Sequence, residues 1–317
     1  MQEQGCSIDE RVWISRRADP YVYRHGDGNY YFTATVPEYD RIILRRAESL
    51  EGLKEAEEKV IWKKHERGPM GNHIWAPELH YLDGEWYLYF AAGDAEDKWH
   101  IRPYVLRCRQ KDPFMGHWEE MGMMQCAQED EFSFRSFSLD GTVFENQGKR
   151  YYVWAEKTGV GKMISNLYIA QMETPVRLKT AQVLLSTPDY PWERRGFWVN
   201  EGPAVLHHAG KIYLTYSASD TGVNYCMGML SMDENQDVLD PANWKKCRNP
   251  VLASDEEKGI YGPGHNSFTE DEEGRPILVF HARTEKEIKG DPLYNPNRHA
   301  MLMPFGWKEG GEPVFKF

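Results

Sequence analysis

Short apolar runs alternate with polar turns along the whole chain, and five segments share one pattern. Each has a short apolar run, a polar turn that ends in glycine, and a second run rich in aromatic and β-branched residues, which is the signature of a β-hairpin. The five segments are DPYVYRHGDGNYYFTAT (19–35), ELHYLDGEWYLYFAA (78–92), DGTVFENQGKRYYVWAE (140–156), EGPAVLHHAGKIYLTYSAS (201–219) and HNSFTEDEEGRPILVFHAR (265–283).

The turn glycines recur about every 60 residues, which indicates one structural unit repeated five times. They are Gly28, Gly84, Gly148, Gly210 and Gly274. Further strand-like runs fill the gaps, at 41–47, 102–108, 165–172 and 224–231. Each unit therefore has room for a four-stranded sheet, and five such sheets predict an all-β, five-bladed β-propeller. A β-sandwich with several hairpins is the alternative, but it would not require such even spacing.

The repeat predicts a single domain over residues 1–317, because no low-complexity or Pro/Ser-rich linker interrupts it. The expected blades lie near residues 13–70, 71–132, 133–192, 193–256 and 257–317, with closure at the chain ends. One segment departs from the strand pattern. SLEGLKEAEEKVIW (49–62) has a helix-favouring composition, and its shortness predicts a turn of helix between blades.

Composition places the chain among globular proteins, with 41% hydrophobic and 27% charged residues. Its net charge of −11 argues against nucleic acid and against an anionic membrane surface as partners. No apolar stretch approaches the ~18 residues of a membrane span. The five cysteines are odd in number and form no CxxC pair, and the first residues lack the apolar core of a signal peptide. We therefore expect reduced thiols and a cytoplasmic protein.

A polar residue opens the first strand of every repeat. These residues are Asp19, Glu78, Asp140, Glu201 and His265. The innermost strand of each blade lines the channel of a propeller, so equivalent positions of different blades converge on its axis. Carboxylates gathered there would be costly as mere structure, because like charges repel and desolvated charges need partners. Such a convergence predicts a functional site.

The chemistry that suits such a site is hydrolysis of a glycosidic bond. One carboxylic acid protonates the leaving oxygen, while another carboxylate activates water or attacks directly. A third carboxylate raises the pKa of the acid, because adjacent negative charge disfavours ionisation. Aromatic residues near these positions offer flat apolar faces for a sugar ring, namely Tyr21, Phe32, Trp75, Phe137 and Trp198.

Five elements together resemble glycoside hydrolase family 43, and most closely its α-L-arabinofuranosidases. They are RRADPYVYRHGDGNYYFTAT, HIWAPELHYLDGEWYLYFAA, SFSLDGTVFENQGKRYYVWAE, WVNEGPAVLHHAGKIYLTYSAS and YGPGHNSF, and the likeness extends over residues 13 to 317. The resemblance implies a five-bladed propeller and an inverting mechanism. It also implies that Asp19 is the general base, that Asp140 tunes the pKa of the acid and orients it, and that Glu201 is the general acid.

The resemblance implies further roles at three positions. Trp75 would form a wall of the sugar pocket, and Arg298, in the shorter motif DPLYNPNRHAMLMPFGW, would reach substrate hydroxyls. His265 would support a calcium or sodium ion on the axis through water, as in many family members, although the chemistry itself requires no cofactor. The substrate-binding residues expected overall are Phe32, Trp75, Phe137, Trp198 and Arg298.

Each of these residues also has a structural interpretation. Asp19 precedes proline and Asp140 precedes glycine, and both dipeptides are common in turns. Glu78 could be a buried carboxylate that accepts hydrogen bonds across blades, Trp75 could belong to the core, and His265 could be a satisfied structural histidine. The equivalence of five positions favours the functional interpretation of the three catalytic carboxylates.

The expected function is hydrolysis of terminal α-L-arabinofuranosyl residues from arabinan or arabinoxylan oligosaccharides by an exo-acting, inverting glycosidase. The partner is therefore an arabinose-containing oligosaccharide or polysaccharide. A β-D-xylosidase of the same fold is one alternative, because the two pentosides present similar bulk. A non-catalytic carbohydrate-binding propeller is the alternative of a different class, and it would bind sugar without hydrolysing it.

Overall fold

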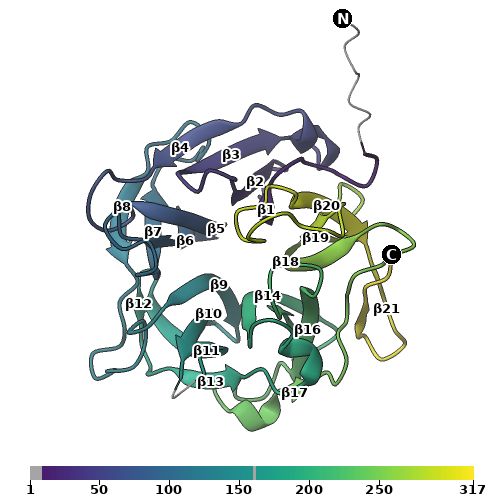
Figure 1. Cartoon of the computed structure of the whole chain (residues 1–317). Helices are drawn as coiled ribbons and strands as arrows, with labels where there is room; N and C mark the ends of the chain where they lie inside the picture. Colours follow the sequence, from purple (N-terminus) through teal and green to yellow (C-terminus); the bar gives the residue numbers. More distant parts are fainter. Residues whose placement is uncertain (1–8, 160–161) are drawn as a thin grey trace, which may run out of the picture.

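Five antiparallel sheets stand around a common centre in the computed structural model, which describes residues 9–159 and 162–317 (Figure 1). The first sheet contains β1 (Ala18–Arg24), β2 (Tyr30–Thr35), β3 (Arg41–Ala47) and β4 (Lys59–Lys63). The second contains β5 (Asn72–Leu82), β6 (Glu85–Gly93), β7 (Arg102–Cys108) and β8 (Glu119–Met123). The third contains β9 (Ser138–Asn146), β10 (Lys149–Thr158), β11 (Ile164–Thr174), β12 (Arg177–Leu178) and β13 (Val183–Ser186).

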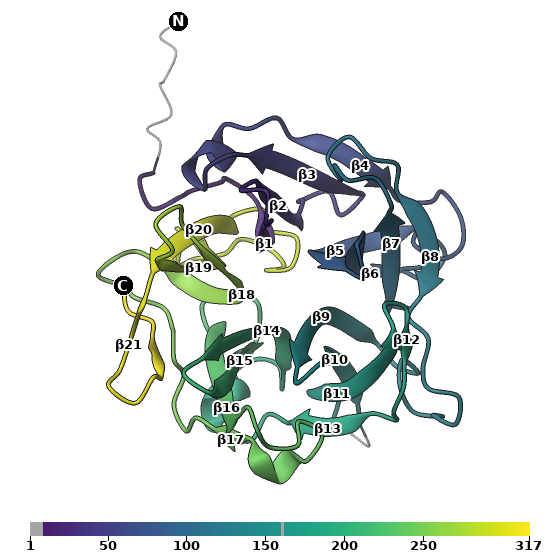
Figure 2. The same ribbon diagram turned by 180° about the vertical axis from the view of Figure 1, so that it is seen from behind.

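The fourth sheet contains β14 (Asn200–His208), β15 (Lys211–Ala218), β16 (Cys226–Asp233) and β17 (Lys245–Lys246), and the fifth β18 (Tyr261–Glu270), β19 (Pro276–Arg283) and β20 (His299–Pro304). A small hairpin of β21 (Gly306–Trp307) and β22 (Pro313–Val314) follows. The innermost strands β1, β5, β9, β14 and β18 contact one another in a ring, as the reverse view also shows (Figure 2). The five-bladed β-propeller predicted from the repeat is confirmed.

The five predicted hairpins form the inner two strands of each blade. Their turn glycines all have positive φ, from +71° at Gly148 to +89° at Gly28, a conformation that glycine adopts without steric cost. The four additional strand-like runs form β3, β7, β11 and β16. In the segment 49–62, one turn of 3-10 helix (Glu51–Lys54) is present as expected, but the following residues begin β4.

The two ends of the propeller are joined through the fifth blade. Ile14 forms an antiparallel bridge with Ala300 on the open edge of β20. The Trp13 N–H donates to the Ala300 carbonyl (3.0 Å), and the Ala300 N–H donates to the Ile14 carbonyl (2.9 Å). The segment before β1 thus adds to the last sheet, so the ring of blades is closed by main-chain hydrogen bonds rather than by packing alone.

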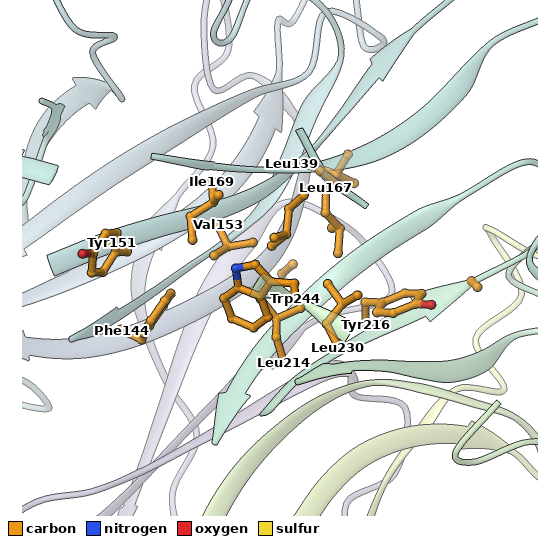
Figure 3. Close-up of a cluster of buried hydrophobic side chains, with 14 of the residues drawn as sticks. Leu139, Phe144, Tyr151, Val153, Leu167, Ile169, Leu214, Tyr216, Leu230 and Trp244 are labelled. Atoms are coloured by element: carbon orange, nitrogen blue, oxygen red, sulfur yellow. The ribbon is translucent and has the colours of Figure 1, made fainter. Parts of the chain in front are cut away.

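The hydrophobic core is divided among the interfaces between neighbouring blades. Five clusters of buried side chains are present, and each lies mainly between two adjacent sheets. Figure 3 shows the cluster between the third and fourth blades. Its labelled members are Leu139, Phe144, Tyr151, Val153, Leu167, Ile169, Leu214, Tyr216, Leu230 and Trp244. Because each buried apolar side chain contributes about 1.5–3 kcal/mol, these interfaces hold the inner strands in fixed relative positions.

Cys108, Cys126, Cys226 and Cys247 are free thiols, as expected, whereas Cys6 lies outside the described residues. The described residues contain three short 3-10 helices, at Glu51–Lys54, Pro191–Glu193 and Pro241–Asn243. None of them is long and apolar enough to cross a membrane.

Candidate active site

Every innermost strand carries a two-residue β-bulge at the same place. In the first blade, Ala18 pairs with Thr35 and Tyr21 with Thr33, so Asp19 and Pro20 together face one residue of β2. The same register shift occurs in the other four inner strands. The first bulged residues are Asp19, Ala76, Asp140, Gly202 and His265, with φ of +51°, +47°, +55°, +55° and +43°. A bulge bends its strand and re-aims the side chain at that point.

The bulges correct the predicted equivalence of the five polar residues. Asp19, Asp140 and His265 do occupy the same structural position. Glu201 lies one residue before its bulge, at the position that Trp75 holds in the second blade, and Glu78 lies directly after the bulge there. Counting back from the turn glycine misses this difference because the intervals between bulge and turn vary in length.

Left-handed backbone at a residue other than glycine costs on the order of 1–3 kcal/mol and persists only where its surroundings fix it. Here the N–H group of a bulged residue is held by a side chain of the preceding blade. Thr35 Oγ1 accepts from Ala76 (2.7 Å), and Ser217 Oγ accepts from His265 (2.6 Å). His281 Nδ1 accepts from Asp19 in the same way (3.1 Å).

These three acceptors occupy one equivalent position, since each pairs with the residue just before the bulge of its own blade. The corresponding residues of the second and third blades are Ala91 and Ala155, which have no acceptor. The N–H of Gly202 donates instead to Asp140 Oδ2 (3.1 Å). Asp140 therefore fixes the backbone next to Glu201.

A cavity of about 580 Å³ opens over these bulges. It brings together eight of the residues singled out from the sequence, namely Asp19, Trp75, Phe137, Asp140, Trp198, Glu201, His265 and Arg298. The cavity therefore collects the three predicted catalytic carboxylates and four of the five predicted substrate-binding residues.

Phe32 is the exception, and its assignment to the sugar site is wrong. Its side chain is fully buried in the core between the first and fifth blades, with its ring 5.4 Å from that of Trp13. Glu78 does not line the cavity either. It is buried, as its structural interpretation expected, but its Oε2 lies 2.9 Å from Nε2 of His80 on the same strand, so this contact is within one blade.

Charge in the cavity is arranged asymmetrically around Asp19. Burial disfavours the ionised carboxyl, but the positive charges of His265 and Arg298 outweigh this effect and hold the pKa of Asp19 well below its ordinary value of 3.8. His265 Nδ1 lies 3.3 Å and Arg298 Nη1 3.8 Å from Asp19 Oδ1. Asp19 is therefore an ionised carboxylate at neutral pH.

The pKa values of Asp140 and Glu201 are shifted in the opposite direction, upward. Burial, together with the negative charges of Glu201 and Asp19, raises the pKa of Asp140 to about 8. Burial also raises the pKa of Glu201, with Asp19 adding to the effect. Interacting carboxyls titrate as a pair, and this pair retains a proton at neutral pH. Carboxyls whose pKa values are pushed apart are the physical basis of an acid and a base in one site.

Several residues of the cavity carried no sequence signal that identified them. Tyr225 donates a hydrogen bond to Glu201 Oε1 (2.8 Å), and Lys157 lies over the ring of Phe137 (3.7 Å to the centroid). Trp99, Met163 and Phe197 are exposed apolar residues that line the cavity. None of the five lies on an innermost strand, where the repeat marked polar residues.

The described residues do not fit a directly bound metal ion. In the ranges 9–159 and 162–317, no group of three or more His, Cys, Asp or Glu side chains is arranged to hold one. Burial lowers the pKa of His265, but Asp19, Asp140 and Glu201 raise it more, which favours the protonated ring that offers no lone pair to a metal. A water-mediated ion near His265 stays a prediction.

The fold and the cavity define a β-propeller with the carboxylate set of a glycoside hydrolase. The model of the glycosyl hydrolases family 43 matches residues 9–313. The chain belongs to this family, as its sequence resemblance implied.

Curated relatives and solved structures agree with this membership. An extracellular exo-α-(1→5)-L-arabinofuranosidase of Streptomyces avermitilis is 49% identical over 95% of this chain, which spans only 61% of that relative. A protein of the same name from Streptomyces chartreusis is 50% identical over 89% of this chain and 85% of its own length. The crystal structure of an α-L-arabinofuranosidase from Lactobacillus brevis matches 96% of this chain and 95% of its own, with a TM-score of 0.90 and 49% identity.

The prediction of a cytoplasmic protein is wrong. Both Streptomyces relatives are named extracellular, which contradicts it. The two clues behind the prediction, the first residues and the unpaired cysteines, do not report the compartment. A leader is removed from a mature protein, and a buried thiol is unreactive in any compartment. Burial raises the pKa of the Cys226 thiol to about 12, for example.

The side-chain acceptors that hold the N–H groups of the bulges, called caps below, predict that two buried threonines of β2 contribute differently to stability. In Thr35→Val, the Ala76 N–H loses its acceptor, and we expect the free energy of unfolding to fall by about 1–3 kcal/mol. Thr33→Val is the matched control, because Thr33 Oγ1 is buried without a partner among the described residues, and we expect no loss. Urea unfolding measures both variants. Equal stability of the two would contradict the capping role.

Proposed function

We propose that this chain is an inverting, exo-acting α-L-arabinofuranosidase that removes terminal residues from arabinan or arabinoxylan oligosaccharides. One observation carries the chemistry: a single cavity holds a carboxylate with a lowered pKa and a carboxyl pair with raised pKa values. The names of the Streptomyces and Lactobacillus relatives support the sugar and the exo mode. Because the chain spans 61% of one relative, the proposal concerns the activity of this domain.

Asp19 is suited to act as the general base. A base must be ionised to accept a proton from the attacking water, and the positive charges of His265 and Arg298 keep it so. The backbone of Asp19 is fixed by the contact of its N–H with His281. In this role the water oxygen attacks the anomeric carbon while its proton passes to Asp19.

Glu201 is suited to act as the general acid. Burial raises the pKa of its carboxyl and the negative charge of Asp19 adds to this effect, which favours the protonated form that an acid needs. As the glycosidic bond breaks, that proton passes to the leaving oxygen. Asp140 supports this role through its charge and through its hydrogen bond to the Gly202 N–H, which fixes the adjacent backbone.

The walls of the cavity offer both apolar and polar contacts to a sugar. The ring of Trp75 is stacked on that of His73 (centroids 4.4 Å apart, 21° between planes), so its orientation is fixed. Arg298 Nη2 lies 2.7 Å from the hydroxyl of Tyr39, which aims the guanidinium. Trp75 therefore supplies a flat face, and Arg298 supplies donors for substrate hydroxyls.

Hydrolysis of a panel of arabinosyl and xylosyl oligosaccharides, with the anomers of the products followed by NMR, tests the proposal. We expect release of arabinose from chain ends, with the β-anomer formed first because inversion places water on the face opposite the leaving group. Xylose as the preferred product would indicate a β-D-xylosidase. Binding without hydrolysis would indicate a carbohydrate-binding propeller, and an α-anomer would contradict the inverting mechanism.

Glu201→Gln separates the role of the acid from that of binding. For natural linkages, whose leaving group needs a proton, we expect kcat to fall by about 10²–10⁴-fold. For aryl arabinosides with good leaving groups the loss should be much smaller, since they depart unprotonated. Asp233→Asn, at a carboxylate of the same blade paired with Lys211 on the surface, is the control and should keep full activity. Equal losses on both substrates would argue against Glu201 as acid.

The pKa shifts predict the pH dependence of kcat/KM. The base must be ionised, and because the pKa of Asp19 is lowered, the acidic limb should lie below pH 3.8. The acid must be protonated, and the raised pKa values of the pair, about 8 for Asp140, place the alkaline limb near pH 8. We expect a plateau between the two limbs in a pH series on an aryl arabinoside. An alkaline limb near pH 5 would contradict the protonated pair.

A further inference from the structure

Tyr225 connects the candidate acid to the candidate base. Its hydroxyl donates to Glu201 Oε1 (2.8 Å), and its ring lies parallel to that of His281, with centroids 5.6 Å apart and 9° between planes. His281 in turn contacts Asp19 twice, through the backbone N–H (3.1 Å) and at Oδ1 (3.3 Å). One stacked pair of rings thus lies between the two carboxyl groups that the reaction uses.

His281 occupies the position at which other blades use a hydroxyl to hold the bulge. Thr35 and Ser217 perform this task for the second and fifth blades, so a histidine is not needed for capping alone. Burial lowers the pKa of His281 to about 4, so the ring is neutral. Because Nδ1 accepts the Asp19 N–H, the proton of the neutral ring resides on Nε2. The additional feature of the histidine is a ring that stacks on Tyr225.

A glycine makes room for the Tyr225 ring. A Cβ at Gly264 would lie 2.5 Å from Cε1 of Tyr225 and 2.9 Å from Oγ of Ser217. Gly264 directly precedes His265 and pairs with His281 in the sheet. The Tyr225 ring therefore packs against the backbone of Gly264, where no side chain fits.

We propose that Tyr225 and His281 are positioning residues that fix the orientation of the acid relative to the base and select the oxygen of Glu201 that carries the catalytic proton. This inference rests on the proposed function. Burial and the nearby carboxylates raise the pKa of Tyr225 well above its ordinary value, so its hydroxyl stays a donor. Since Oε1 accepts that hydrogen bond, the proton of Glu201 resides on Oε2.

The same contact assists the transfer itself. The proton leaves Oε2 for the glycosidic oxygen as the bond from that oxygen to the anomeric carbon breaks, while water adds to the carbon and gives its proton to Asp19. Glu201 then carries a negative charge, and hydrogen bonds to charged groups are stronger than those to neutral ones. The bond from Tyr225 therefore gains strength as the acid ionises.

Tyr225→Phe tests the hydroxyl while keeping the ring. We expect kcat on natural linkages to fall by about 10- to 100-fold, with KM changed little. Loss of a donor to the charged form raises the pKa of the acid, so the alkaline limb should move to higher pH. The groups that face Glu201 and influence this limb are Asp19, Asp140, Lys157, Tyr225 and His265. Tyr213→Phe, at a buried tyrosine on β15 away from the cavity, should change neither quantity.

His281→Ser tests the second ring. It supplies the hydroxyl that Ser217 supplies in the neighbouring blade, so the Asp19 N–H keeps an acceptor while the stack on Tyr225 is lost. We expect kcat to fall and the alkaline limb to shift in the same direction as in Tyr225→Phe. In the double variant, the fold-decrease in kcat should be smaller than the product of the two single decreases, because both residues act on one contact. Gly264→Ala, which displaces the Tyr225 ring, should reproduce the shift if His281→Ser unfolds.

A readout independent of turnover separates this inference from the proposed function. The carboxyl of Glu201, followed by ¹³C NMR, should titrate at higher pH in Tyr225→Phe than in the unchanged chain. If that shift occurs but no pentoside is hydrolysed, the proposed function fails and the contact remains. If pentosides are hydrolysed but neither the titration nor the alkaline limb moves in Tyr225→Phe, or the two single losses multiply, the positioning role is overturned.

Discussion

The site depends on a backbone constraint that occurs in every blade. Each inner strand is bulged at the cavity, and the first bulged residue is left-handed, at Asp19, Ala76, Asp140, Gly202 and His265. Four of these are not glycine and cost on the order of 1–3 kcal/mol each. Hydrophobic packing between blades holds them in place, and side chains of the preceding blade accept the N–H groups of Asp19, Ala76 and His265. Strain at the cavity is therefore maintained by the same interfaces that make the ring rigid.

The bulges also explain why chemically similar groups behave differently. Asp19 and Asp140 occupy equivalent positions, yet their pKa values move in opposite directions. Asp19 lies 3.3 Å from His265 and 3.8 Å from Arg298, whereas Asp140 is 3.8 Å from His265 and shares its surroundings with Glu201. Since the backbone geometry is common to both, the difference arises from the neighbouring blades. The electrostatic field in the cavity is therefore asymmetric, although the backbone fold is symmetric.

Much of the fold and part of the site follow from local sequence signals. Turn glycines and paired apolar runs predict the hairpins, and equal spacing predicts the five blades. The three carboxylates were found because each is a charged residue at the start of an apolar strand. Phe32 was misplaced because a strand alternates its faces, and only the pairing register shows which face meets the core. Tyr225 precedes β16 and His281 lies on β19, so neither is on an innermost strand, and the repeat marked polar residues only at the start of those strands.

Hydrogen bonds in the cavity favour release of the proton that the acid gives to the leaving oxygen. The pKa values of Asp140 and Glu201 are both raised, and each carboxyl has a donor aimed at its charged form, the Gly202 N–H for Asp140 and the Tyr225 hydroxyl for Glu201. The donor to Asp140 comes from the backbone because the capping position of the third blade is Ala155, which leaves Gly202 without a hydroxyl acceptor. Each carboxylate is therefore stabilised in its ionised form while the other holds the proton. An acid in this arrangement can release its proton to a leaving oxygen without becoming an unpaired buried charge.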